Sequence, residues 1–339
     1  MSSKINKTKT TKRKSQPKKK KAKKELNDLI EELSQKLRKC SVVESGDENL
    51  TDCEVLSETD VEISAKKQKL SEHRINLLKF NKHIPANCVN FRVKRGLNVS
   101  FSNGCSVNYF LLAFWTTFEI EPSIINDKLE NLSIKSTVNN DICKILCEVV
   151  KLIDWNDWGK AKYVWLHDFL KKEIPLTKIY DCFGSTKEFV FDFYKPLQEY
   201  TYKIVCECHD EKSTSTTYNE ITIDYCENIR TPTVNECKVC NKVEFEIINF
   251  KTEPIWLIIH PDVNIFNQKT DCFKTTIEFE NGNKYKLLAC VIGKPGHFQA
   301  IFYLNSLFYL VDDIDSSCKQ INKDFSFQID CFIYMKMYE

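Results

Sequence analysis

Cys105 stands where a polar segment meets a long apolar one. Residues 100–104, SFSNG, form a polar loop, and the apolar run of residues 107–118 is long enough for about three helical turns. This pattern predicts a helix that begins at or near Cys105, directly after a glycine that tolerates unusual backbone angles. The positive end of a helix dipole lowers the pKa of a thiol placed there. Cys105 is therefore a candidate nucleophile, and the alternative is a small buried apolar side chain.

A second segment whose residues could take part in catalysis lies near the C-terminus. In the stretch GHFQAIFYLNSLFYLVDD, His297 opens a strand, a two-residue turn follows, and the return strand ends in Asp312 and Asp313. A hairpin of this length makes His297 and Asp312 cross-strand neighbours. Because side chains alternate along a strand, we expect only one of the two aspartates to face the histidine. A carboxylate that orients a histidine, which in turn activates a thiol, is the arrangement of a cysteine hydrolase.

Together these segments resemble the ubiquitin-specific protease family of cysteine proteases. The family has an Asn three residues after its cysteine, as Asn108 stands to Cys105, and its histidine lies in a Gly-His-aromatic strand paired with a strand that ends in Asp-Asp. Three further segments are similar: GSTKEFVFDFYKPL, EPIWLIIHPDVN and IEFENGNKYKLLACVIGKPGH. The resemblance runs from about residue 96 to residue 339. The short domain, and the pattern Asp-Asp-Ile-x-x-x-Cys that ends at Cys318, look closest to the SUMO isopeptidase branch.

The resemblance implies a role for each residue of a catalytic triad. Cys105 would be the nucleophile, His297 the base, and Asp312 the carboxylate that orients His297. Asp313 ranks second, as a support for the oxyanion-side polar network or as a cap of the strand.

Two positions depart from the family pattern. Ser106 stands where the family has an aromatic residue after the cysteine, and Ser100 stands where it has an Asn that helps to stabilise the oxyanion. Asn98 and Asn103 are nearby and are the candidates for that donor.

The order of elements predicts the fold class. Two helices, near residues 142–152 and 165–170, follow the cysteine helix, and residues 181–200 resemble the helical thumb of the family. Strands rich in β-branched and aromatic residues follow from residue 200 onward. Helices first and strands later indicate an α+β domain. The resemblance makes it a papain-like cysteine protease of the ubiquitin-specific protease type, with a helical thumb, an antiparallel-sheet palm, and fingers at about residues 200–250.

Four cysteines in two close pairs predict a metal site in the fingers. Cys206 and Cys208 form one pair, and Cys237 and Cys240 form the other. Such a set suits tetrahedral zinc, and the family often has a four-cysteine zinc site at this place. The first pair is one residue shorter than usual, so His209 is an alternative to Cys208. Four thiols in a zinc-free finger is the other interpretation.

The composition of the whole chain bears on the state of its cysteines and on its domain organisation. The 339 residues are 42% apolar with a net charge of +2, and the chain has sixteen cysteines. Without a secretory signal or an apolar run of membrane-spanning length, the cysteines are expected to be reduced thiols, some of them metal ligands. Residues 1–24 contain twelve lysines or arginines and no acid. We expect a disordered basic tail with a nuclear localisation signal at 1–24, an amphipathic helix at 25–40, an acidic linker at 41–65 and the catalytic domain at 66–339.

These observations support three hypotheses about function. The first, implied by the resemblance, is a thiol isopeptidase that removes ubiquitin or SUMO from lysine side chains of target proteins. We expect it in the nucleus, with the cytoplasm as the alternative location. Its partners would be those modifiers, their protein conjugates, and importin through the basic tail, with no membrane. The second is a catalytically inactive module of the same fold that binds a ubiquitin-like modifier. The third is a zinc-containing nucleic-acid-binding protein whose basic tail contacts phosphates weakly and without sequence preference.

Overall fold

The computed structural model describes residues 75–93, 98–134, 136–175, 178–191, 194–206, 208–213, 221–223, 230–261, 268–270, 273–279, 281–322 and 325–338. The chain divides into two compact units, Met1–Ser45 and Gly46–Glu339, and every described residue belongs to the second. The predictions for residues 1–65, namely the basic tail, the amphipathic helix and the acidic linker, lie outside the described residues. In the described part, helices come first and mostly antiparallel sheets follow, which confirms the α+β prediction at that level.

Helices dominate the described chain before residue 200. The α-helices are α3 (Leu77–Lys82), α4 (Cys105–Ile120), α5 (Glu130–Ser133), α6 (Thr137–Asp154) and α7 (Trp158–Tyr163). Wider π-helical turns are η2 (Ile124–Leu129), η3 (Val164–Phe169) and η4 (Lys187–Phe191), and η5 (Lys195–Leu197) is a 3-10 turn. Within the described residues, no helix is both long enough and apolar enough to cross a membrane.

The strands form three sheets in the described residues. The first has the order β1-β2-β3, the second β15-β14-β13-β12-β16-β9-β6 with β10 and β11 attached to β16 and β12, and the third β5-β4-β8-β7. Two pairs, β2 with β3 and β6 with β9, are parallel, and the other pairs are antiparallel. The bounds are β1 Val89–Arg92, β2 Asn98–Ser102, β3 Ile179–Asp181, β4 Tyr200–Cys206, β5 His209–Ser213, β6 Ile221–Ile223, β7 Arg230–Glu236, β8 Val243–Phe250, β9 Trp256–Pro261, β10 Gln268–Lys269, β11 Thr276–Glu278, β12 Lys284–Lys294, β13 His297–Leu304, β14 Leu307–Asp312, β15 Ser317–Gln320 and β16 Ser326–Lys336.

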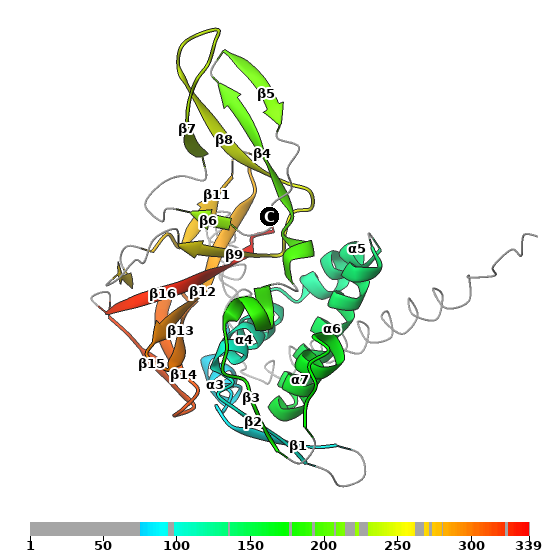
Figure 1. Ribbon diagram of the computed structural model, residues 1–339. Coiled ribbons are helices and arrows are strands. Elements are labelled where there is room, and N and C mark those ends of the chain that lie inside the picture. Colours follow the sequence, from blue (N-terminus) through cyan, green and yellow to red (C-terminus); the bar gives the residue numbers. More distant parts are fainter. Residues whose placement is uncertain are drawn as a thin grey trace, which may run out of the picture. The chain divides into compact units, whose positions relative to one another are not determined.

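Helix α4 lies at the centre of the core. Its residues from Cys105 to Phe118 are all buried, which explains why its sequence is apolar on every side rather than on one stripe. It packs against α6 on one side and against β12 and β13 on the other (Figure 1). The ring of Phe114 lies 4.8 Å from that of Trp256, whose Nε1 donates to Thr117 Oγ1 at 2.7 Å. Burying each such aromatic side chain stabilises the fold by about 1.5–3 kcal/mol, so these contacts hold α4 in the core.

The hairpin of β13 and β14 follows from its turn. Asn305 and Ser306 both have positive φ, at 51° and 67°, as a two-residue type I′ turn requires. Ala300 then pairs with Val311, and one further step along this register places Gln299 opposite Asp312. Side chains two residues apart share a face of a strand, so His297 lies diagonally from Asp312.

Two local predictions were wrong. The polar loop expected at residues 100–104 is largely strand β2, because Val99 and Phe101 alternate into the core at 0% and 1% exposure. The segment at residues 181–200 is not one long helix in its described part. It begins at the end of β3, which pairs with β2, and contains only the short turns η4 and η5. In both places tertiary pairing outweighs the local pattern.

Candidate active site

Cys105 is the first residue of α4. Gly104 precedes it at the N-cap, and no side chain caps the helix. The first backbone N–H groups of α4, which form the positive end of the helix dipole, therefore have no capping side chain as a partner. The Cys105 residue is 3% exposed, and the backbone N–H of Phe298, the residue after His297, forms a hydrogen bond with its thiol. Burial raises the pKa of Cys105, the Phe298 contact lowers it, and the charge of Asp313 raises it further. The net pKa lies above the ordinary value, so this arrangement alone favours the thiol.

His297 is oriented by Asp312. Its Nε2 lies 3.1 Å from Asp312 Oδ1, while Gln299 Nε2 donates to the other carboxylate oxygen of Asp312. Burial acts to raise the pKa of Asp312, but the backbone N–H of Ile314 and the side chains of Gln299 and His297 lower it below the ordinary value. A charged Asp312 holds the proton on Nε2, so Nδ1 is the nitrogen available to accept a proton from a thiol.

Asp313 also faces His297, contrary to the prediction that strand alternation would separate the two aspartates. Its Oδ1 lies 3.7 Å from His297 Nε2. The reason is that β14 ends at Asp312 and a turn begins at Asp313, so the alternation of the strand no longer applies. Asp313 is fully buried, and it accepts hydrogen bonds from Asn108 Nδ2 at 2.5 Å and from Tyr109 Oη at 3.1 Å. It thus joins the end of the hairpin to the first turn of α4.

The structure brings the predicted triad residues to one place without closing the triad. A ring nitrogen of His297 and one carboxylate oxygen each of Asp312 and Asp313 lie within 4.8 Å of one another. Cys105 lies beside the backbone that carries His297. Between these described residues, no hydrogen bond or ion pair joins the thiol to the imidazole. The candidate nucleophile, base and orienting carboxylate therefore lie in one part of the fold, without a direct bond between the thiol and the imidazole.

The segment of residues 85–88 ties these parts together, and sequence reasoning missed it. Asn87 N donates to the carbonyl oxygen of Asp313 at 2.9 Å, and Asn87 Oδ1 accepts from Gly104 N at 3.0 Å. One residue therefore links the turn before the nucleophile to the end of the histidine hairpin. No local sequence signal marks Asn87, because its partners are distant in the chain. Gln299 was also missed, although its place two residues after His297 on the same strand face could have indicated it.

The two oxyanion candidates differ in position. Asn98 is the exposed first residue of β2, and a strand rise of about 3.3 Å per residue carries it about 13 Å from Ser102. Its place at the far, exposed end of this strand does not favour it as the oxyanion donor. Asn103 stands in the turn before Gly104 with φ of 52°, but its Nδ2 donates to Asp181 Oδ1 at 2.9 Å. The backbone N–H groups at the start of α4 remain the best-placed oxyanion donors.

The four predicted metal ligands gather at one end of the sheet β5-β4-β8-β7. The Sγ atoms lie within 4.8 Å of one another, with Cys206 3.1 Å from Cys240, Cys208 3.4 Å from Cys237, and Cys206 3.6 Å from Cys208. These separations are too long for disulfides and are near the roughly 3.8 Å that four sulfurs at 2.3 Å from a tetrahedral zinc would show. Cys208 completes the set, so the alternative with His209 is not needed. The donor set fits zinc.

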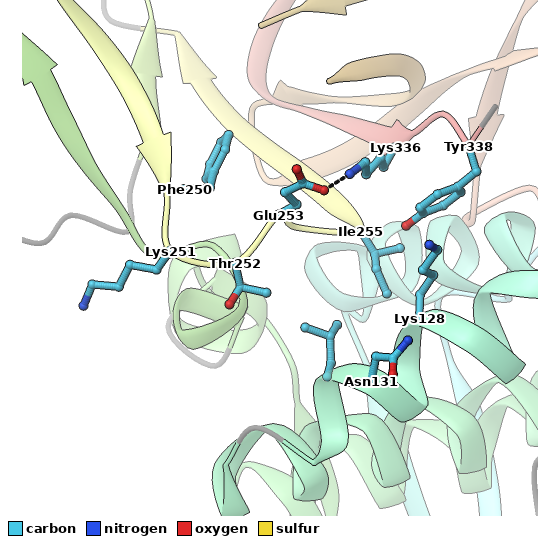
Figure 2. Close-up of a pocket in the computed structure, with 10 residues that line it drawn as sticks. Lys128, Asn131, Phe250, Lys251, Thr252, Glu253, Ile255, Lys336 and Tyr338 are labelled. Carbon is cyan, nitrogen blue, oxygen red and sulfur yellow. Dashed lines mark hydrogen bonds and ion pairs between the residues drawn. The ribbon is translucent and has the colours of Figure 1, made fainter. Parts of the chain in front are cut away.

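A separate pocket of about 400 Å³ lies away from these residues. Figure 2 shows Lys128 and Asn131 on one side and Glu253 paired with Lys336 on the other, with Tyr338 beside Lys128. The ammonium of Lys128 lies 4.7 Å from the centroid of the Tyr338 ring. None of the candidate catalytic residues lines this pocket, so the chemistry described above does not belong to it.

Comparisons with known proteins add little to this picture. No family model and no curated protein matches the chain. Similar solved structures include the SAGA DUB module bound to monoubiquitin, at 10% identity, 83% coverage of this chain, 75% of that chain and a TM-score of 0.34. The SAGA DUB module that contains Ubp8 is 10% identical, with 83% of this chain and 74% of that chain covered and a TM-score of 0.38. An essential yeast splicing factor is 12% identical, with 85% of this chain and 82% of that chain covered and a TM-score of 0.38. At TM-scores this low the likenesses establish neither a shared fold nor an activity for this chain.

Proposed function

We propose that the protein is a cysteine isopeptidase of the ubiquitin-specific protease type, which removes ubiquitin or a ubiquitin-like modifier such as SUMO from lysine side chains. The observation that carries the proposal is the group of His297, Asp312 and Asp313 set beside the helix start that carries Cys105. A buried thiol, a histidine and a carboxylate in this relation are what acyl transfer by a cysteine requires. In this reading the helices form the thumb, the large sheet the palm, and the sheet with the four cysteines the fingers.

The proposed reaction begins with a proton transfer. Nδ1 of His297 takes the proton of Cys105, and the thiolate attacks the carbonyl carbon of the isopeptide bond. The oxyanion is held by the N–H groups at the start of α4, which in other hydrolases stabilise the transition state by roughly 3 kcal/mol per donor. The C–N bond breaks, the lysine amine leaves with the proton from His297, and a thioester remains on Cys105. Water, deprotonated by His297, then hydrolyses the thioester and restores the thiol.

A zinc ion would have a structural part in this scheme. Cys206, Cys208, Cys237 and Cys240 would hold it and fix the end of the sheet β5-β4-β8-β7. Nuclear location, import through the basic tail and weak nucleic-acid contact remain proposals that rest on residues 1–24 alone.

An electrophilic probe tests the activity. Ubiquitin and SUMO, each with a C-terminal vinyl sulfone, should be compared in parallel, and at least one should form a covalent adduct on Cys105. Cys105→Ala should abolish the adduct, and Cys88→Ala, which changes an exposed cysteine, should leave it intact. Adduct formation by Cys105→Ala would reject the assignment of the nucleophile.

A second candidate function is supported by one specific observation. Within the described residues, no hydrogen bond or ion pair joins the Cys105 thiol to His297, and burial raises the pKa of the thiol, as expected of an inactive module that only binds a modifier. Such a module would bind unmodified ubiquitin or SUMO but would not react with either probe. The same experiment therefore separates the two candidates.

A further inference from the structure

Lys162 is a buried cation close to the candidate nucleophile. It lies on α7 with 0% of its surface exposed. A buried ammonium is unfavourable unless hydrogen-bond acceptors or negative charges surround it. The hydrogen bond described for its Nζ goes to the carbonyl oxygen of Ala86, at 3.4 Å. Since an ammonium can donate three hydrogen bonds, this single long contact does not explain why a lysine occupies the position.

The ammonium reaches the turn that precedes Cys105. A methyl group placed on Gly104 would lie 2.4 Å from Nζ of Lys162 and 3.2 Å from Oδ1 of Asn108. Asn108 Oδ1 is buried and has no hydrogen-bond partner among the described residues, while Nδ2 of the same amide donates to Asp313. A buried donor and a buried acceptor thus approach the same point, directly under the start of α4.

Four titratable groups favour the Lys162 ammonium when they are ionised. They are Cys182 after β3, Asp313 after β14, Cys88 before β1 and Cys105 on α4. Burial lowers the pKa of Lys162 to about 8 although these groups oppose the shift, so the side chain carries its proton at neutral pH. The buried charge of Asp313, by contrast, raises the pKa of the Cys105 thiol. The buried carboxylate of Asp313 thus disfavours the Cys105 thiolate, and the buried ammonium of Lys162 favours it.

We propose that Lys162 is a positioning residue for the nucleophile: its buried ammonium supports the turn at Gly104 and offsets the charge of Asp313, so that Cys105 can form a thiolate. The proposal rests on the proposed function for its meaning in catalysis. Its effect on the thiol is measurable independently of any modifier. Lys162 lies on α7, a helix that contains none of the predicted site residues.

The test measures how the reactivity of Cys105 depends on pH. Lys162→Met removes the charge while keeping an apolar side chain of similar length, and Lys160→Met on the same helix is the matched control. Alkylation by iodoacetamide is followed on the Cys105 peptide by mass spectrometry, because the chain has sixteen cysteines. In Lys162→Met the midpoint of the pH profile should rise by about one unit, so that alkylation at pH 7 is about tenfold slower. Lys160→Met should keep the wild-type midpoint.

The outcomes separate an electrostatic role from a structural one. If Lys162 only fills space, Lys162→Met changes the rate at all pH values by one factor and leaves the midpoint in place, and this result overturns the proposal. Gly104→Ala decides the question if Lys162→Met does not fold, because the added methyl group displaces the ammonium without removing its charge. A raised midpoint in Gly104→Ala supports the proposal and an unchanged midpoint overturns it. Failure of wild-type protein to react with modifier probes would refute the proposed function but would not alter these readings.

Discussion

Asp313→Ala should destabilise the fold much more than Asp312→Ala, although the two residues are adjacent. Asp313 is fully buried and is the acceptor for Asn108 Nδ2 and for the hydroxyl of Tyr109. Asp312 has a side chain that is 17% exposed, so water can replace part of what it binds. The two neighbouring carboxylates thus differ in how far water can replace their hydrogen bonds.

The size of the difference follows from the groups left behind. Each buried donor that loses its acceptor costs about 1–3 kcal/mol, and Asp313→Ala leaves two such donors. It also removes a negative charge that favours the buried Lys162 ammonium, which adds to the loss. Allowing for relaxation, we expect a net loss of about 3–5 kcal/mol for Asp313→Ala and about 1 kcal/mol for Asp312→Ala. For a domain of this size, the larger loss lowers the melting temperature by roughly 6–20 °C.

Urea unfolding of the full chain measures both losses, and Asp315→Ala is the control because Asp315 is exposed in the same turn.

The loss of activity should show the opposite order, with Asp312→Ala the more affected variant. With a modifier–fluorophore conjugate, at a temperature where all variants are folded, Asp312→Ala should lower kcat/KM by about 10²–10⁴-fold because His297 loses its fixed tautomer. Asp313→Ala should lower it less. Equal stability of the two variants would refute the buried network, and the reverse order of activity would show that Asp313 orients the histidine.

Three further outcomes are expected. Cys105→Ala should lose all turnover of a modifier–fluorophore conjugate while it still binds the modifier, and residual turnover in the pure variant would contradict the nucleophile. Metal analysis should find about one zinc per chain, and removal of zinc should lower the melting temperature, whereas folded and active protein without zinc would refute the metal site. Because the folded pKa of Lys162, about 8, lies below its ordinary value of 10.5, the unfolded chain binds the extra proton between these pH values. Wild-type protein should therefore gain up to about 3 kcal/mol of stability from pH 8 to pH 10.5 relative to Lys162→Met, and parallel stability curves would contradict this.

The parts of the fold that the sequence predicted well are those with a strong local pattern. The helix after Cys105 and the hairpin from His297 to Asp312 have long apolar runs and a turn sequence that permits few alternatives. Strand β2 was missed because only Val99 and Phe101 mark it, and two alternating residues do not distinguish a strand from a loop. Strand β3 was missed for a related reason, since it is three residues long and exists only through its pairing with β2.

The site itself was predictable only as far as chemistry is tied to residue type. Cysteine, histidine and aspartate were named because few other residues can perform the reaction. Asn87 and Lys162 could not be named, since asparagine and lysine are common and these two act through partners far away in the chain. The two serines at which the chain departs from the family pattern show the same limit. Ser106 is buried and donates to the carbonyl oxygen of Cys182 at 3.2 Å, so it fixes β3 against α4.

Asn87 supports the turn before Cys105 from a position distant in the chain. A helix start that presents a nucleophile must be held on both sides, because the first N–H groups of a helix have no partner within it. Here Asn87 accepts from Gly104 on one side and its own N–H binds the carbonyl of Asp313 on the other. A side-chain amide therefore stands at the cysteine turn even though the position five residues before Cys105 is serine. Asn87 Oδ1 accepts a hydrogen bond there, whereas the Asn of the family pattern would donate one to the oxyanion, so Asn87 supports the cysteine turn and leaves the oxyanion to the N–H groups at the start of α4.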